Sequence, residues 1–325
     1  MDRPTVTAPS EVHDPTSATF TAAVSLNPTA PRFLDAAFTA VTQLCPWPKA
    51  YGGDLVAQAA TAAMRTVTDG KSMHSMHSYF LRPADVGVEL RYEVELLRDG
   101  RGYSTRQVRG YQNDRVIYAC LANFAAGEPS GSFALPMPEQ PSAPESVPSA
   151  KAYLEARTGG TMTEESKRYW SCERSFDMRH VPGPVYLSVE GARVPYQAIW
   201  VRPFDALRDV PGLDSAQRDL AALAYVCDYT ILEPILRVLG LAWAEVGLVT
   251  ASLDHAMWFH RPGKVDGWLL YAQQAVAADN GRGLGHGLFF DADGTHLATV
   301  LQEGMIRHRS TDSRSSATGT EAPAR

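Results

Sequence analysis

An aspartate inside an apolar segment is the first residue of this sequence that could do chemistry. Asp228 stands in the run LAYVCDYTIL, beside Tyr225, Val226 and Leu232. A buried carboxylate without a partner is costly, so such a residue caps a helix, pairs with an arginine or has a function. Burial would also raise its pKa above the ordinary value of about 3.9, which makes the carboxylate a stronger general base. We predict that Asp228 is functional.

The segment SLDHAMWFHRP, residues 252–262, adds a serine and two histidines. Histidine titrates near neutral pH and binds metals, so the segment raises two possibilities. One is Ser252 as a covalent nucleophile with His255 as its base, and the other is a metal site that includes His260. No third ligand or HExxH spacing accompanies the histidines, and no serine lies in a GxSxG sequence. We therefore expect no metal and no cofactor, and a structural hydrogen bond for His255.

The segment GRGLGHG, residues 281–287, has alternating glycines, a pattern that could indicate a phosphate-binding loop. A nucleotide loop leads into a helix, whereas this segment follows a turn signal and leads into a predicted strand. Close backbone packing or the close approach of a ligand explains the glycines better.

Composition sets the broad class of the protein. The chain has 325 residues, of which 45% are hydrophobic, enough for a core in one large domain or two ordinary ones. A net charge of −6 argues against a nucleic-acid partner. The four cysteines form no CxxC pair, which fits a reducing cytosol. The start MDRPTVTAPSEVHDP lacks the apolar core of a signal peptide. No apolar run in the sequence is long enough to span a membrane. We expect a cytoplasmic protein without stable membrane insertion.

A weak internal repeat organises the sequence. HSYFLRP, residues 77–83, resembles HAMWFHRP, residues 255–262, and both end in FxRP. Two copies of one structural unit on either side of a linker explain such a repeat. By the repeat alignment, Met73 lies opposite Ser252 and Ala122 lies opposite Gln302.

Each half shows the same predicted elements, an apolar helix followed by a strand meander. The helices are predicted at 55–67 and 220–239, and Pro234 should kink or end the second one. Alternating residues and turn signals predict strands at 88–96, 103–111, 116–124, 267–277, 283–290 and 295–306. Because both helices are apolar on most sides, we expect each to be buried by a sheet wrapped around it.

This arrangement resembles the double hotdog fold, an α+β fold of two tandem repeats, each with a central helix wrapped by an antiparallel sheet. The local sequences resemble the type II acyl-CoA thioesterase family. The matching blocks are YGGDLVAQA (51–59), HSYFLRP, LLRDGRGYSTRQV (96–108), IWVRP (199–203), SLDHAMWFHRP and LQEGMI (301–306). The tryptophan-containing block is the most specific of them.

The resemblance implies an acyl-CoA thioesterase that hydrolyses fatty acyl-CoA through a water activated by Asp228, Ser252 and Gln302. It places Asp228 on the central helix of the second repeat. Since Met73 and Ala122 cannot replace the serine and the glutamine, only the second half should catalyse. The sequence departs from the family pattern at Ser252, where threonine is common, at Asp54, where an uncharged polar residue is expected, and in a long segment at 128–184.

Substrate and partners follow from the same resemblance. Arg82 and Arg261 stand at equivalent repeat positions and, with Lys264, could hold the phosphates of coenzyme A. The family also implies a homo-oligomer. Two other functions fit the predicted fold, since a fold does not decide its chemistry: an enoyl-CoA hydratase and a binding protein that sequesters acyl-CoA without turnover.

Three segments rich in proline or small polar residues suggest the domain boundaries. We predict a disordered N-terminus at 1–27, an N-terminal hotdog at 28–127, a linker and insertion at 128–184, a C-terminal catalytic hotdog at 185–308 and a disordered tail at 309–325.

Overall fold

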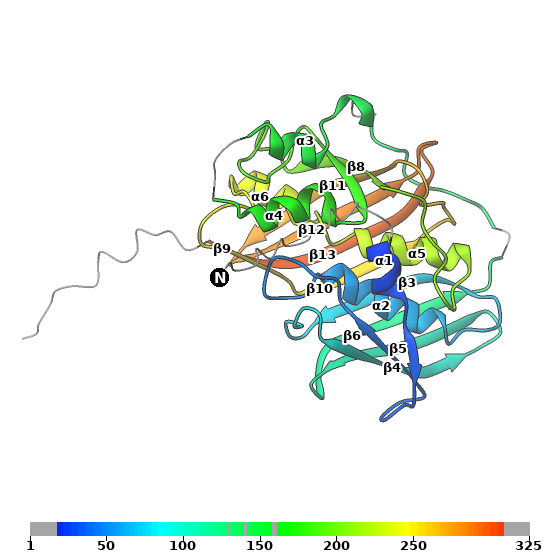
Figure 1. The fold of residues 1–325 in the computed structure, drawn as a ribbon. Helices are drawn as coiled ribbons and strands as arrows, with labels where there is room; N and C mark the ends of the chain where they lie inside the picture. The colour runs from blue at the N-terminus through cyan, green and yellow to red at the C-terminus, as the bar shows by residue number, and fades with distance from the viewer. Residues whose placement is uncertain (1–17, 129, 140–141, 158–160, 309–325) are drawn as a thin grey trace, which may run out of the picture.

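The computed structural model of the chain describes residues 18–128, 130–139, 142–157 and 161–308. Its strands form one antiparallel sheet in the order β1-β2-β4-β5-β6-β3-β10-β13-β12-β11-β8-β7, with β9 paired to β13 (Figure 1). The elements of the first half are α1 (Ala18–Val24), β1 (Asn27–Thr29), β2 (Ala36–Val41), α2 (Gly52–Met64), β3 (Ser72–Phe80), β4 (Glu89–Asp99), β5 (Tyr103–Gln112) and β6 (Arg115–Ala125).

The second half begins with short helical pieces and then repeats the strand order. Its elements are η1 (Pro144–Ser146), α3 (Ala150–Glu155), α4 (Glu164–Arg168), η2 (Tyr169–Glu173), β7 (Phe176–Val181), β8 (Tyr196–Pro203), α5 (Ser215–Val226), α6 (Glu233–Leu239), β9 (Leu248–Ser252), β10 (Asp254–Phe259), β11 (Leu269–Asp279), β12 (Arg282–Phe290) and β13 (His296–His308). The predicted strands are confirmed, with their ends shifted by a few residues.

The two halves meet at the antiparallel pair β3 and β10, where His77 pairs with Ala256. These two residues are also equivalent in the FxRP alignment, so a pseudo-twofold axis passes between them. The next strand outward is β6 in the first half and β13 in the second. β6 pairs with β3 in the same register in which β13 pairs with β10. Ala122 therefore lies where Gln302 lies in the other half, in agreement with the repeat alignment. This arrangement is the predicted double hotdog.

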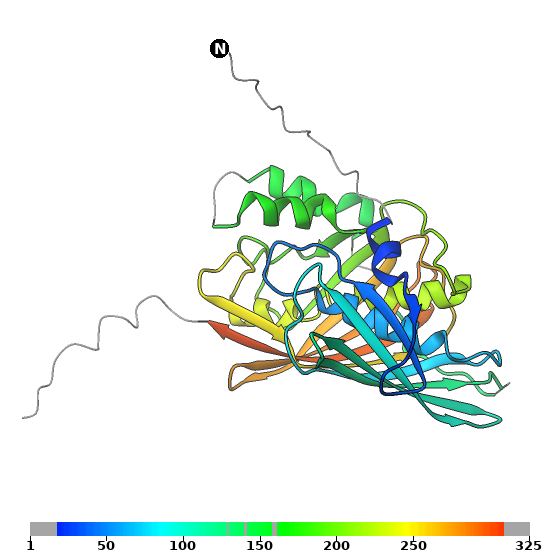
Figure 2. The same cartoon turned by 60° about the horizontal axis from the view of Figure 1, so that its bottom comes forward.

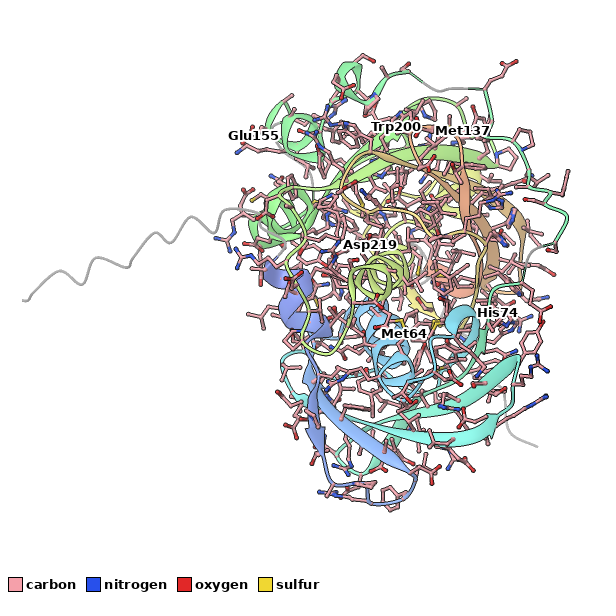
Figure 3. All side chains as sticks on the ribbon, turned by 90° about the vertical axis from the view of Figure 1, so that its right-hand side faces the viewer. Met64, His74, Met137, Glu155, Trp200 and Asp219 are labelled. Carbon is pink, nitrogen blue, oxygen red and sulfur yellow. The ribbon has the colours of Figure 1, made fainter. Side chains whose placement is uncertain are left out.

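The central helices α2 and α5 pack against each other on one face of the sheet. Figure 2 shows the helices gathered on that face, with green α3 and α4 farthest from the sheet, and Figure 3 marks α2 and α5 by Met64 and Asp219. The contact is close because α2 is rich in glycine and alanine. A Cβ added at Gly53 would lie 2.2 Å from the carbonyl oxygen of Tyr225. The Tyr51 hydroxyl donates to the same oxygen at 2.5 Å.

The predicted helix at 220–239 is wrong in one respect, because it is two helices. α5 ends at Val226, residues 227–232 form turns, and α6 starts at Glu233 with Pro234 in its first turn. Proline has no N–H to donate and fits the first turn of a helix, where that donor has no helical partner. Asp228 consequently lies in the turn between two helices and not on the central helix.

Hairpin turns connect the meander strands as the sequence predicts. Asn280 and Gly281 have φ values of 50° and 72°, and Asn113 and Asp114 have values of 51° and 58°. Two successive residues with positive φ give the turn type that matches the twist of paired strands.

The predicted boundaries need two corrections. Residues 18–24, in the predicted disordered N-terminus, form α1, and Phe20 on it is fully buried against the core. β7, in the predicted linker and insertion, pairs with β8, so the sheet of the second half begins at Phe176. Both segments bury apolar side chains despite their polar, proline-rich surroundings. Residues 1–17 and the predicted tail at 309–325 lie outside the described residues.

The connector between the halves covers part of the other face of the sheet. Met137 packs against a small cluster of Ala198, Trp200, Leu270 and Phe290, and Figure 3 shows Met137 beside Trp200. The Trp200 indole N–H donates to the carbonyl oxygen of Ser142 at 2.9 Å. In the described part of the chain, no helix is long and apolar enough to cross a membrane.

Candidate active site

Asp228, Ser252 and Gln302 come together at the junction of the two halves. The Ser252 hydroxyl donates to Asp228 Oδ1 at 2.8 Å, and the Gln302 amide donates to the same oxygen at 2.5 Å. Gln302 Nε2 also lies 3.0 Å from Ser252 Oγ. The aspartate comes from the turn after α5, the serine from the end of β9 and the glutamine from the middle of β13. Three distant segments of the second half thus form one hydrogen-bonded cluster.

A glycine strand lets the turn that carries Asp228 approach the sheet. Gly285 on β12 pairs with Gln302, and a Cβ added at Gly285 would lie 2.4 Å from the carbonyl oxygen of Ile231. Gly283 makes a similar approach to the side chain of Ile235 on α6. The interpretation of the alternating glycines as a close-packing feature is confirmed.

The first half also contributes to the site, through the start of α2. The backbone N–H groups of Gly52 and Gly53 act to lower the pKa of the Asp228 carboxyl. A Cβ added at Gly52 would lie 2.6 Å from Asp228 Oδ2. The N-terminus of a helix carries a partial positive charge and free N–H groups, which favour a carboxylate. One carboxylate oxygen therefore faces α2, while the other faces Ser252 and Gln302.

Burial raises the pKa of Asp228 above its ordinary value, although hydrogen bonds from Gln302, Ser252 and the two glycine amides favour the ionised form. The carboxyl lies within a dense shell of protein atoms, and part of the residue stays open to a cavity. An aspartate with a raised pKa takes up a proton more readily than an exposed one, as a general base requires.

His255 lies behind this cluster and is buried. Its Nδ1 is 3.0 Å from Gln302 Oε1, and its Nε2 is 3.7 Å from the sulfur of Cys227. Burial lowers the pKa of His255 to about 4, so the ring is neutral at neutral pH. The expected structural hydrogen bond is confirmed. Both ring nitrogens face partners other than Ser252, whose hydroxyl is bonded to Asp228, so the geometry does not favour a Ser252–His255 nucleophile pair.

A cavity of about 900 Å³ opens beside Asp228 and Ser252. One wall consists of Trp47, Trp170 and Trp243, with the rings of Trp170 and Trp243 stacked at 6.1 Å between centroids. Trp170 lies on η2, in the inserted segment, and Trp47 comes from the first half. The apolar lining also includes Leu55, Phe80, Met162, Leu232, Val249 and Met305. The cavity can hold an extended apolar group next to the carboxylate.

Of the three basic residues predicted to bind coenzyme A, only Arg82 lines this cavity. Arg261 lies elsewhere and donates to Ser132 Oγ at 2.7 Å, and Lys264 is exposed outside the lining. Sequence reasoning missed Lys49, which lines the cavity and donates to the carbonyl oxygen of Thr250 at 3.0 Å. Its position two residues before the YGGD block was the available signal.

The equivalent place in the other half lacks the cluster. There the end of α2 is followed by Arg65, and a Cβ added at Gly212, shortly before α5, would lie 2.7 Å from Arg65 Nε. Met73 and Ala122 stand at the positions that correspond to Ser252 and Gln302, so the serine and the glutamine have no counterpart there. Among the described residues, no group of three or more His, Cys, Asp and Glu side chains could hold a metal ion.

The sheet, the two central helices and the cluster of Asp228, Ser252 and Gln302 between the halves define the class of the protein, a double hotdog with a polar site at the junction of its halves. A solved structure from Alicyclobacillus acidocaldarius, described as having a hot dog fold, shares this fold with a TM-score of 0.67 at 18% identity, and the match covers 90% of this chain and 99% of that one.

Sequence comparisons give the family. A family model described as the acyl-CoA thioesterase N-terminal domain matches residues 45–125, and one described as the C-terminal domain matches residues 144–306. The human acyl-coenzyme A thioesterase 8 is 33% identical over 275 residues, 81% of this chain and 82% of that protein. Acyl-CoA thioesterase 2 of Haemophilus influenzae is 32% identical over 276 residues, 84% and 93% of the two chains.

A solved structure leads to the same family. The acyl-CoA thioesterase II TesB2 of Mycobacterium marinum is 30% identical with a TM-score of 0.69, and the match covers 89% of this chain and 99% of that one. The chain belongs to the type II acyl-CoA thioesterase family and is a thioester hydrolase.

Proposed function

We propose that this protein hydrolyses fatty acyl-CoA to a free fatty acid and coenzyme A, through a water activated by Asp228, Ser252 and Gln302. The observation that carries the proposal is the convergence of these side chains, at 2.5 to 3.0 Å from one another, beside an apolar cavity. A carboxylate, a hydroxyl and an amide are the groups needed to accept a proton from a water and to fix its orientation.

In the proposed reaction, the water lies between Asp228 and the thioester carbonyl carbon. Asp228 accepts one proton as the water oxygen bonds to that carbon, while Ser252 and Gln302 orient the water. The tetrahedral intermediate then expels the sulfur of coenzyme A, and the proton held by Asp228 passes to that sulfur. The products are a carboxylic acid, which ionises, and a free thiol. General base catalysis of this kind typically contributes about 10²–10⁴-fold in rate.

The cavity supports an assignment of the two ends of the substrate. The acyl tail would lie along Trp47, Trp170 and Trp243, which offer a large apolar surface. The phosphates of coenzyme A would lie near Arg82 and Lys49, because both cations line the same cavity. Arg261 and Lys264 are not part of this proposal.

Assembly into a homo-oligomer is also part of the proposal. The face of the sheet away from the helices exposes apolar side chains near the pseudo-twofold axis, including Tyr79 and Leu121, which are 62% and 50% exposed. A contiguous exposed apolar surface favours association. A reducing cytosol remains the proposed compartment, since the cysteines at 45, 120, 172 and 227 are all free thiols.

The test is release of free thiol from acyl-CoAs of increasing chain length, with Asp228→Asn as the control. Asparagine keeps the shape of aspartate but cannot accept the proton. We expect a loss of at least about 10²-fold in kcat, with binding of acyl-CoA retained. Unchanged thiol release by Asp228→Asn would overturn the mechanism. A 3-hydroxyacyl product from an enoyl-CoA, without free thiol, would instead support the hydratase, and binding without turnover would support the sequestering protein.

A further inference from the structure

The amide of Gln302 must point in one direction for the site to form. Its Nε2 donates to Asp228 Oδ1 and lies beside Ser252 Oγ. If the amide rotated by half a turn, its carbonyl oxygen would face the carboxylate and two acceptors would meet. Asp228 and Ser252 favour the observed orientation, but a water beside them could bridge to either end of the amide. A contact on the far side of the amide is therefore important.

His255 makes that contact. Its Nδ1 lies 3.0 Å from Gln302 Oε1. Because an amide oxygen can only accept, Nδ1 must carry the hydrogen, and Nε2 is then the acceptor nitrogen. Nε2 faces the thiol of Cys227 at 3.7 Å, and that thiol also lies 3.1 Å from the carbonyl oxygen of Ala224. The ring is only 1% exposed, so water does not compete for either nitrogen.

The backbone holds His255 in register with Gln302. The strand breaks at Leu253, between β9 and β10, where the N–H of Leu253 donates to the carbonyl oxygen of Glu303 at 2.9 Å. The N–H of Glu303 in turn donates to Asp254 Oδ1 at 2.9 Å. These two bonds tie Leu253 and Asp254, which precede His255, to Glu303, which follows Gln302.

We infer that His255 is a positioning residue that keeps the N–H₂ end of the Gln302 amide directed at Asp228 and Ser252. This inference rests on the proposed function, since it concerns the same cluster. His255 does not touch the reacting atoms. It acts by donating its Nδ1 hydrogen to Gln302 Oε1, which makes the rotated amide unfavourable.

Loss of this donor should affect the reaction and not the binding of substrate. With the amide free to rotate, Asp228 loses a donor for part of the time and Ser252 loses its neighbour. The hydrogen bond that is weakened is the one from the Gln302 amide to the charged Asp228 carboxylate. The free energy of such a bond corresponds to about 10- to 100-fold in rate, so kcat should fall by that factor with little change in KM. Ionised Asp228 would also be less favoured, so the acid limb of kcat/KM should move to higher pH.

Two amide substitutions provide a matched test. In His255→Asn, the side-chain N–H₂ can occupy the place of Nδ1, whereas in His255→Gln the longer side chain carries its amide beyond that place. Glutamine is closer in size to histidine, so a residue that merely fills space would tolerate glutamine better. We expect His255→Asn to keep kcat within a few-fold of the wild type. We expect His255→Gln to lose about 10- to 100-fold and to show the shifted acid limb.

The measurements are kcat, KM and the pH dependence of kcat/KM with one acyl-CoA, after circular dichroism shows that each variant is folded. Met257→Leu, on the same strand and buried in the core, is the control and should behave like the wild type. The inference is overturned if His255→Gln is as active as the wild type, or if the asparagine and glutamine variants are equally impaired with an unmoved acid limb.

Asp228→Asn and Gln302→Ala, measured in parallel, separate this inference from the proposed function. If both keep full activity, the proposed function fails and the inference fails with it. If both lose activity while His255→Gln does not, only the inference fails.

Discussion

Replacing Gly52 by alanine should displace the Asp228 carboxylate, which we propose as the general base, without weakening the fold. An added Cβ would lie 2.6 Å from Asp228 Oδ2, 3.1 Å from its Cγ and 3.2 Å from a ring carbon of Phe80. Ordinary contacts begin at 3.4 Å, so the carboxyl must move by about 0.8 Å. A misplacement of about 1 Å in an active site can cost about 10²-fold, so we expect kcat to fall by about 10- to 100-fold.

The free energy of unfolding should not fall by a comparable amount. Gly52 begins α2, its φ is not in the left-handed region, and alanine is favoured over glycine in helices by up to about 1 kcal/mol. Gly267→Ala is the control, because a Cβ there meets no atom within 4 Å.

Thiol release and urea unfolding should be measured on both variants and the wild type. Wild-type kcat in a folded Gly52→Ala would refute the idea that the contact between α2 and Asp228 sets the position of the base. Equal losses in Gly52→Ala and Gly267→Ala would point to a general effect of added side chains.

Two other variants test the cavity and the core. Lys49→Ala should raise KM for acyl-CoA several-fold with kcat little changed. The increase in KM should be smaller at high salt, because the proposed contact with the phosphates is ionic. An unchanged KM would show that Lys49 is not part of the coenzyme A site. Burial raises the pKa of Asp54 to about 8, so the folded state keeps this proton at a pH where the unfolded state, with an ordinary pKa near about 3.9, has lost it. The free energy of unfolding should therefore fall by up to about 1.4 kcal/mol per pH unit between about pH 4 and 8. Urea unfolding of Asp54→Asn should show a shallower decline with pH. Identical slopes of unfolding free energy against pH in the variant and the wild type would contradict burial of the acid.

The fold was predictable because its signals are local. Alternating strand residues and the turn at Asn280–Gly281 depend on neighbours in the chain, and the structure has strands and turns at those places. The break before Pro234 was less clear, because apolar residues continue through 227–232 and hide the end of α5. Tertiary packing against Gly285 decides that this stretch is a turn.

The residues of the site were only partly predictable. Asp228 is conspicuous by itself, because a carboxylate in an apolar run is costly without a role. Ser252 and Gln302 look like ordinary strand residues, and only the resemblance to a family selected them. Their distances to Asp228 depend on the pairing of β9 with β13, which no local pattern contains.

The repeat could not show which of the two equivalent arginines lies at the cavity, because it treats both halves alike. Arg82 and Arg261 are equivalent in sequence, and each lies just after the end of its strand, β3 or β10. Because these two strands are antiparallel, the two arginines lie at opposite ends of the strand pair. Arg82 follows Phe80, whose N–H donates to the carbonyl oxygen of Leu253 next to Ser252. Of the two arginines, Arg82 therefore lines the cavity beside Ser252.

The sequence by itself determined the two repeats, the buried helices, the hairpin turns and one conspicuous acid, because each depends on residues close together in the chain. The tertiary structure alone decided that the site lies between the halves, where Gly52 of the first half lies against Asp228 of the second and Lys49 lines the same cavity. The physical reason is that the pseudo-twofold axis brings the start of α2 against the end of α5. That contact joins residues more than a hundred positions apart, and no periodicity records it.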